Sequence, residues 1–319
     1  MKILFVSEKI KSKRASHRLR GELTVKALKE LGYDASTSNG ISPEVCDSNT
    51  VAIFLKHSQP HSIEQAKSLG AFCIYDICDN KFEEKDEYIP CCNLSDYISV
   101  SSEQMRLWVE HHTGRPSIAI PEAYERPRLE PKFKPGSVIK LLWFGSSASL
   151  KFVDWVTLWS RLETEIGNYE MTIVTAKSER MQNKMASRSR LTEYKNVNLS
   201  KIKFVEWTWE AQGQALEECD CVLMPIGESH RTETKSANRV IDSLISGRYV
   251  ITSPIQSYEE FAGYTWQQDF IEGIKYAVQN PAIIETQIKL GQQHVMEHYS
   301  PEIIANRWLE AIDAARRDS

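Results

Sequence analysis

Short apolar runs alternate with longer polar or amphipathic stretches along the first part of the chain. Runs of this length, bounded by charges and turn residues, are typical of buried parallel strands. They cover 2–7, 33–37, 51–55, 71–75, 97–100 and 117–120. Between them, apolar residues at helical spacing predict helices over 23–31, 62–69 and 103–112, the last capped by Ser102. This alternation of strand and helix predicts a doubly wound α/β sheet.

The second part of the chain repeats this pattern after a stretch rich in proline and charge. Residues 125–136 have the composition of an interdomain linker. Strands are then predicted over 139–144, 171–174, 202–205, 221–224 and 249–252, with helices over 152–166, 236–246, 269–279 and 303–315. The polar and basic residues 177–199 are interpreted as a mobile surface excursion. We therefore predict two α/β domains, over residues 1–130 and 137–300.

Composition and charge narrow the classes of protein that the chain can belong to. Its 319 residues suit two domains, with 41% hydrophobic and 26% charged residues, as in ordinary globular proteins. The net charge of −4 disfavours a nucleic-acid partner, for which residues 177–199 are the single support. No apolar run approaches the ~18 residues needed to span a bilayer. Seven scattered cysteines without a CxxC pair favour reduced thiols in a cytoplasmic protein over a zinc site.

Polar side chains follow several of the predicted strands of the first domain. The carboxyl ends of parallel strands meet at one edge of a sheet, where ligands of doubly wound folds bind. We therefore expect these side chains to converge on that edge, although each alone is more often a solvent contact. They are Arg18 and Arg20 after the first strand, Lys56 and His57 after the third, Asp76 and Asp79 after the fourth, and Glu122 after the sixth.

Two stretches of the second domain could hold a phosphate. The turn Gly145-Ser-Ser-Ala-Ser-Leu-Lys151 follows a predicted strand, and its small residues let backbone N–H groups approach an anion closely. Residues 235–242, Lys-Ser-Ala-Asn-Arg-Val-Ile-Asp, place basic side chains at a predicted helix start near Ser236, where free N–H groups and the helix dipole favour an anion. An ordinary loop with incidental basic residues explains the second stretch about equally well.

These motifs resemble those of GT-B glycosyltransferases, in particular retaining members of glycosyltransferase family 4. The turn 145–151 is similar to the family's glycine–arginine…lysine turn, with Lys151 matching the lysine and Ser146 standing at the arginine. Residues 241–254 resemble the family's "E-A-x-A-x-G-x-P-V-V-A-S" segment, in which Asp242 takes the place of the ribose-binding glutamate. The closing helix from Tyr299 resembles the one that crosses back to the first domain. The resemblance implies two Rossmann-like domains facing across a cleft, with the helix at about 301–319 packing on the first.

The resemblance also implies a function and a set of site residues. We expect a transferase of polysaccharide or glycoconjugate biosynthesis that moves a sugar from a UDP- or GDP-sugar to a glycan or small-molecule acceptor. No cofactor and no metal are expected, because no convincing D-x-D motif is present. Peripheral membrane association and the oligomeric state stay open. The expected donor residues are Gly145, Ser146, Ser147, Lys151, Lys235, Ser236, Asn238, Arg239 and Asp242.

Departures from the family pattern leave the chemistry undecided. The first glutamate of the family's carboxylate pair is absent, and Thr234 stands in its place. If the reaction inverts the sugar, a general base is required, and His57 or Asp79 is the candidate. If it retains the configuration, no such base is needed, and these residues only orient the acceptor beside Arg18, Arg20 and Asp76. A catalytically inactive nucleotide-sugar-binding partner protein and a sugar-nucleotide epimerase of the same architecture are the alternatives.

Overall fold

The computed structural model describes residues 1–7, 15–56, 59–83, 88–188, 195–227 and 230–317. The chain divides into two compact units. Unit 1 comprises residues 1–125, 229–238 and 297–319, and unit 2 comprises residues 126–228 and 239–296. The division differs from the predicted domains mainly at residues 229–238, which the sequence pattern assigned to the second domain and which cluster with unit 1.

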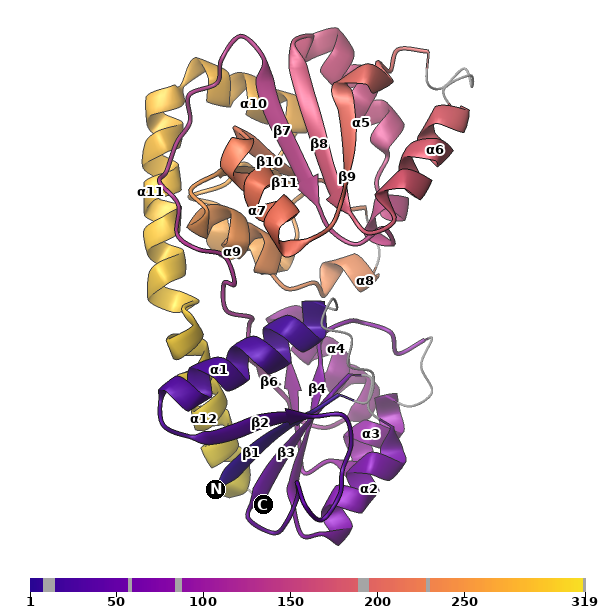
Figure 1. The fold of residues 1–319 in the computed structure, drawn as a ribbon, viewed down its shortest axis with the longest axis vertical. Coiled ribbons are helices and arrows are strands. Elements are labelled where there is room, and N and C mark those ends of the chain that lie inside the picture. Colours follow the sequence, from indigo (N-terminus) through magenta and orange to yellow (C-terminus); the bar gives the residue numbers. More distant parts are fainter. Residues whose placement is uncertain (8–14, 57–58, 84–87, 189–194, 228–229, 318–319) are drawn as a thin grey trace. The chain divides into compact units, whose positions relative to one another are not determined.

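Unit 1 is built on a parallel sheet with the order β2-β1-β3-β4-β5-β6 (Figure 1). The predicted strands are confirmed within one or two residues at most ends, because short apolar runs that are buried on both faces are specified locally. Their bounds are β1 Lys2–Val6, β2 Asp34–Ser38, β3 Thr50–Leu55, β4 Phe72–Ile77, β5 Tyr97–Val100 and β6 Ile118–Ala119. The strand order changes direction between β1 and β3, which makes the carboxyl ends of these two strands the expected ligand edge.

Helices cover both faces of this sheet. Helix α4 begins where predicted, since Ser102 Oγ accepts a hydrogen bond from Met105 N, and it ends at the left-handed Gly114. Helices α1 and α12 pack against one another (Figure 1), and Trp308 of α12 meets Phe5 edge to face at a centroid distance of 5.4 Å. The bounds are π-helix His17–Glu22, α1 Leu23–Glu30, α2 Pro60–Ser68, α3 Tyr88–Leu94, α4 Glu103–Thr113, α8 His230–Glu233 and α12 Pro301–Arg317.

Unit 2 contains a second parallel sheet, with the order β11-β10-β7-β8-β9. Its direction of winding changes between β7 and β10, as in dinucleotide-binding folds. Three of its strands have the predicted bounds and the other two are longer. They are β7 Ile139–Phe144, β8 Tyr169–Thr175, β9 Ile202–Glu206, β10 Cys221–Met224 and β11 Tyr249–Thr252. The two sheets together confirm the predicted fold class.

The helices of unit 2 depart from prediction in three places. Residues 178–188 form helix α6, so this part of the predicted excursion 177–199 was wrong, while residues 189–194 lie outside the described residues. The predicted helix 152–166 is a 3-10 turn, α5 and a π-helix, because Asp154 caps the helix by accepting from Thr157 N. Helix α9 starts at Asn238, two residues late. The bounds are α5 Trp155–Arg161, α6 Ser178–Arg188, α7 Trp209–Glu218, α9 Asn238–Ile245, α10 Phe270–Gln279 and α11 Pro281–His298.

The predicted linker 125–136 packs onto unit 2 over most of its length. Phe133 is 1% exposed and joins the core of unit 2, and the buried Arg248 donates to Glu130 O at 3.1 Å. Gly247, at φ 63°, has Glu130 O only 2.8 Å from the position of an added Cβ, so both backbone conformation and space demand glycine there. Proline and charge therefore marked an extended segment correctly, but its one apolar side chain anchors it.

No helix in the described residues is both long enough and apolar enough to cross a membrane.

Candidate functional site

The turn after β7 lies at the carboxyl edge of the unit 2 sheet, beside the point where the strand order reverses. Gly145 N donates to Val174 O at 3.1 Å, which holds the turn against β8. A Cβ on Gly145 would lie 3.1 Å from the Trp143 ring and 3.2 Å from Arg239 Nη1. This spacing is tighter than ordinary van der Waals contact. The residue must therefore be small if the backbone is to stay at this edge.

Ser146 and Ser147 continue this turn. Ser146 is exposed, and its hydroxyl lies 3.0 Å from that of Ser149, which starts a short 3-10 helix, Ser149–Phe152. Lys151 lies within this helix. The structure thus provides a turn with an exposed hydroxyl, as the sequence predicted, and the role of these residues as donor ligands stays a prediction.

Arg239 brings a positive charge to the same turn from the first residues of α9. Its Nη1 donates to Phe144 O at 3.2 Å, and its guanidinium carbon lies 6.0 Å from the centre of the Trp143 ring. Burial raises the pKa of Tyr258, and the neighbouring Arg239 charge partly offsets that rise. The predicted proximity of Arg239 to the Gly145 turn is therefore present. Asp242, one turn further along α9, is only 3% exposed, so a ribose contact would use a largely buried carboxyl.

Lys235, Ser236 and Asn238, predicted as donor ligands, belong to the segment that clusters with unit 1. Ser102 Oγ donates to Thr234 O at 2.8 Å, and Ser236 makes a side-chain hydrogen bond with Glu122. The Lys235 charge lies close enough to Asp79 to act on its pKa. These contacts explain why α9 starts late, because the backbone before Asn238 follows unit 1 and not the helix.

Arg20 and Asp76 form a buried ion pair at the carboxyl edge of unit 1. Each is 1% exposed, and Arg20 Nε donates to Asp76 Oδ2 at 3.0 Å. Arg20 also donates to Ile120 O, and Ser99 Oγ donates to Asp76 Oδ1 at 2.8 Å. A pair this buried and this well bonded positions the strands around it. The acceptor contact predicted for both residues stays a prediction, and it would have to reach groups that already bind each other.

Arg18 is likewise paired. It makes two hydrogen bonds to Glu125, one of them from Nη2 to Oε1 at 2.7 Å, and its side chain is 18% exposed. Glu125 lies at the end of unit 1, so this bidentate pair fixes the start of the π-helix to the last residues of the unit.

Asp79, one of the two catalytic candidates, forms an ion pair with Lys56 and keeps 41% of its side chain exposed. Burial acts to raise the pKa of Asp79, but the charge and hydrogen bond of Lys56, with help from Lys81 and Lys235, outweigh it and lower that pKa. A carboxylate held in its anionic form can orient a hydroxyl group but is a weak general base near neutral pH. His57, the other candidate, lies outside the described residues.

The sequence analysis assigned no role to Glu122, and the structure gives it partners. It is 5% exposed, lies just after β6 and shares the Arg20–Asp76 neighbourhood. A glutamate directly after a predicted strand was the visible signal, but only the fold shows that its carboxyl is buried. Among the described residues, no group of three or more His, Cys, Asp or Glu side chains could hold a metal ion.

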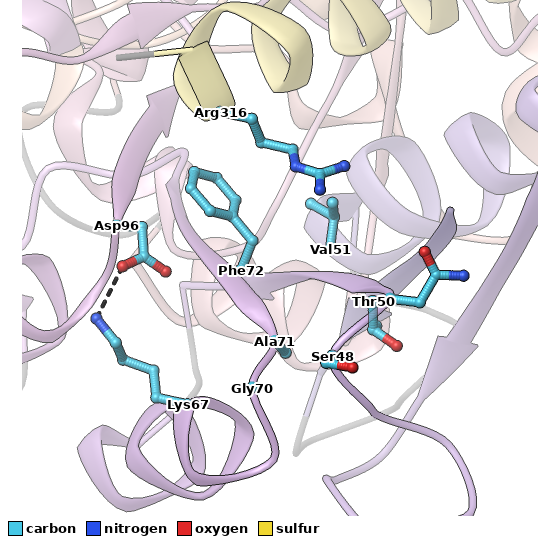
Figure 2. Close-up of a pocket in the computed structure, with 10 residues that line it drawn as sticks. Ser48, Thr50, Val51, Lys67, Gly70, Ala71, Phe72, Asp96 and Arg316 are labelled. Atoms are coloured by element: carbon cyan, nitrogen blue, oxygen red, sulfur yellow. Dashed lines mark hydrogen bonds and ion pairs between the residues drawn. The ribbon is translucent and has the colours of Figure 1, made fainter. Parts of the chain in front are cut away.

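One cavity of unit 1 lies away from these residues. It measures about 310 Å³ and sits at the amino ends of β3 and β4, where Thr50 and Phe72 begin their strands. Figure 2 shows Lys67 paired with Asp96 at 2.8 Å and Arg316 extending from α12 over Val51. Ligands of such sheets bind at the carboxyl ends, so this cavity is not part of the predicted site.

The fold as a whole is similar to that of solved glycosyltransferase structures. HepE from Anabaena, solved in complex with UDP and glucose, matches with a TM-score of 0.71 at 10% identity over 98% of this chain and 99% of that one. Sucrose-phosphate synthase from Thermosynechococcus elongatus matches with 0.68 at 12% identity over 100% of each chain. TarM matches with 0.63 at 15% identity over 90% of this chain and 57% of that one, so the chain spans little more than half of TarM.

These likenesses identify the chain as a protein of GT-B fold, divergent in sequence from the structures it resembles. No protein-family model and no curated protein sequence matches it.

Proposed function

We propose that the protein is a glycosyltransferase that moves a sugar from a nucleotide-sugar donor to an acceptor without a bound metal ion. The observation that carries the proposal is the meeting of Gly145 and Arg239 at the carboxyl edge of unit 2, where the strand order reverses. A small residue there exposes backbone and an arginine supplies charge. The similarity of the fold to HepE, which was solved with UDP and glucose, supports the choice of ligand.

On the donor side, transfer breaks the bond between the sugar C1 and the diphosphate oxygen, which leaves negative charge on the diphosphate. Without a metal ion, that charge is met by basic side chains and by the free N–H groups of a helix start. Arg239 lies at the start of α9, and the Gly145–Lys151 turn contributes backbone N–H groups. Lys235 and Asn238 are the further proposed contacts, with Asp242 at the ribose.

On the acceptor side, the proposed residues are those of the carboxyl edge of unit 1. Asp79 is the described residue that retains the most accessible carboxylate among them, at 41% side-chain exposure. We assign it the role of orienting the acceptor hydroxyl through a charge-assisted hydrogen bond. An inverting reaction would call on His57 as the base, and a retaining reaction would need none.

The test is a turnover assay with a panel of UDP- and GDP-sugars, with and without candidate sugar acceptors and with EDTA. The proposal predicts slow donor hydrolysis that accelerates with one class of acceptor and resists EDTA. Nucleotide binding without turnover in the presence of any acceptor would instead indicate an inactive binding protein. Interconversion of the sugar without its transfer would indicate an epimerase. Absence of any nucleoside diphosphate binding by calorimetry would refute the proposal.

A further inference from the structure

The segment 230–238 is anchored to unit 1 at two points. Ser102, the cap of α4, donates its hydroxyl to Thr234 O at 2.8 Å, and Thr234 is 1% exposed. Two residues further on, Ser236 is hydrogen-bonded to the side chain of Glu122. In the chain, Lys235 stands between the two anchors and Asn238 follows the second. The backbone geometry of these two residues therefore depends on both contacts.

Glu122 occupies an unusual place for a carboxyl group. It is 5% exposed, and its Oε2 has no hydrogen-bond partner among the described residues. Burial raises the pKa of Glu122, Arg20 from the π-helix and the Ser236 hydroxyl act against that rise, and Asp76 from β4 adds to it. Cys78, just after β4, also lies within its electrostatic reach. A buried carboxyl with one oxygen unpaired is costly, and its known partner is the segment 230–238.

We propose that Glu122 is a positioning residue for the nucleotide: through Ser236 it fixes residues 234–238, so that Lys235 and Asn238 are presented to the donor diphosphate. This inference rests on the proposed function, in which these two residues contact the diphosphate. A carboxyl that stays largely protonated can hold Ser236 without placing a full negative charge beside an anionic ligand. Ionisation of Glu122 adds that charge and weakens the binding of the anion.

The variants separate positioning from simple stability. Glu122→Gln keeps the shape and a carbonyl acceptor for Ser236 but cannot ionise, whereas Glu122→Ala and Ser236→Ala each remove the contact. Glu103→Gln, on the exposed face of α4 with 58% side-chain exposure, is the matched control. Ser236→Ala removes only a hydroxyl group, so it keeps the test valid if Glu122→Ala does not fold. Thermal unfolding identifies any variant that has lost its structure.

The measurement is the affinity for UDP and for GDP by titration calorimetry, repeated across pH. Loss of the contact is expected to weaken binding of whichever nucleotide the wild type binds by about 5- to 20-fold, and the double variant Glu122→Ala/Ser236→Ala should be no worse than either single variant. In the turnover assay, KM for the donor should rise more than kcat falls. The affinity of the wild type should fall with rising pH more steeply than that of Glu122→Gln, whose profile retains only the titration of the nucleotide and other groups.

Two results would overturn the inference while leaving the proposed function intact. One is unchanged nucleotide affinity in Ser236→Ala and in folded Glu122→Ala. The other is a pH profile of Glu122→Gln identical to that of the wild type, together with additive effects of the two alanine substitutions. If the wild type itself binds neither UDP nor GDP, the proposed function fails, and that result is seen before any variant is measured.

Discussion

The carboxyl edges of the two sheets solve different problems with different chemistry. At the edge of unit 1, Arg20, Asp76, Glu122 and Lys56 are at least nine-tenths buried, and Arg20 and Lys56 are each paired with a carboxylate. At the edge of unit 2, a glycine and exposed serine backbone lie beside the half-buried guanidinium of Arg239. Paired buried charges shape loops, whereas accessible backbone with one cation is suited to an anion. Similar sheets therefore offer a positioning edge in unit 1 and a binding edge in unit 2.

The largest expected effect is on stability, at the edge of unit 1. Arg20→Met leaves the buried Asp76 without its partner, which should lower the free energy of unfolding by about 3–5 kcal/mol. Arg106→Met is the control, because Arg106 pairs with Glu103 and Glu110 on the exposed face of α4 and should cost less than about 1 kcal/mol. Urea unfolding measures both. Equal losses would mean that the Arg20 pair contributes no more than a surface ion pair.

The next effect is on ligand affinity, through the proposed phosphate contacts. Arg239→Ala with Lys235→Ala should weaken donor affinity by about 2–4 kcal/mol if both side chains contact phosphate. Calorimetry with UDP and GDP measures this. The matched control is Lys203→Ala, an exposed lysine on β9 of unit 2, which should leave affinity unchanged. A double variant that binds like the wild type would remove Arg239 and Lys235 from the site.

A smaller effect tests the close approach at Gly145. Gly145→Val forces contact with the Trp143 ring and Arg239, and should destabilise unit 2 by about 1–3 kcal/mol while weakening nucleotide binding. Gly136→Val is the control, since nothing lies within 4 Å of a Cβ at that position. Thermal unfolding and calorimetry together report the two effects. A Gly145→Val protein as stable as Gly136→Val and equally able to bind nucleotide would show that the turn tolerates side chains.

The smallest effects are in the pH dependence of stability, where two carboxyl groups of unit 1 act in opposite directions. The lowered pKa of Asp79 stabilises the fold above its ordinary value of 3.8, and this contribution is lost as pH falls through the lowered value. The raised pKa of Glu122 stabilises the fold below 4.5, and this contribution is lost as pH rises through the raised value. Lys56→Met should shift the Asp79 titration upward, as followed by carboxyl NMR. An unshifted titration would exclude Lys56 as the cause.

The strands and the fold class were readable from the sequence because their signal is local. The apolar run Cys221–Met224 is buried wherever it sits in a parallel sheet, and its predicted bounds are the observed ones. The cap at Ser102 was readable for the same reason, since its hydrogen bond reaches only to Met105. Helix α9 was placed two residues early, because nothing near Ser236 in the sequence shows that its partner is Glu122, more than a hundred residues away.

By itself, the sequence determined two doubly wound sheets and the polar residues that follow their strands, because apolar periodicity and turn chemistry act over a few residues. The tertiary structure alone decided what those polar residues do. Arg20 and Asp76 were expected to face a ligand and instead bind each other at 1% exposure, and the segment carrying Lys235 clusters with unit 1. Charge pairing depends on long-range proximity and burial, which a single sequence does not record. Arg239 beside Gly145 is the predicted contact that the fold brought together.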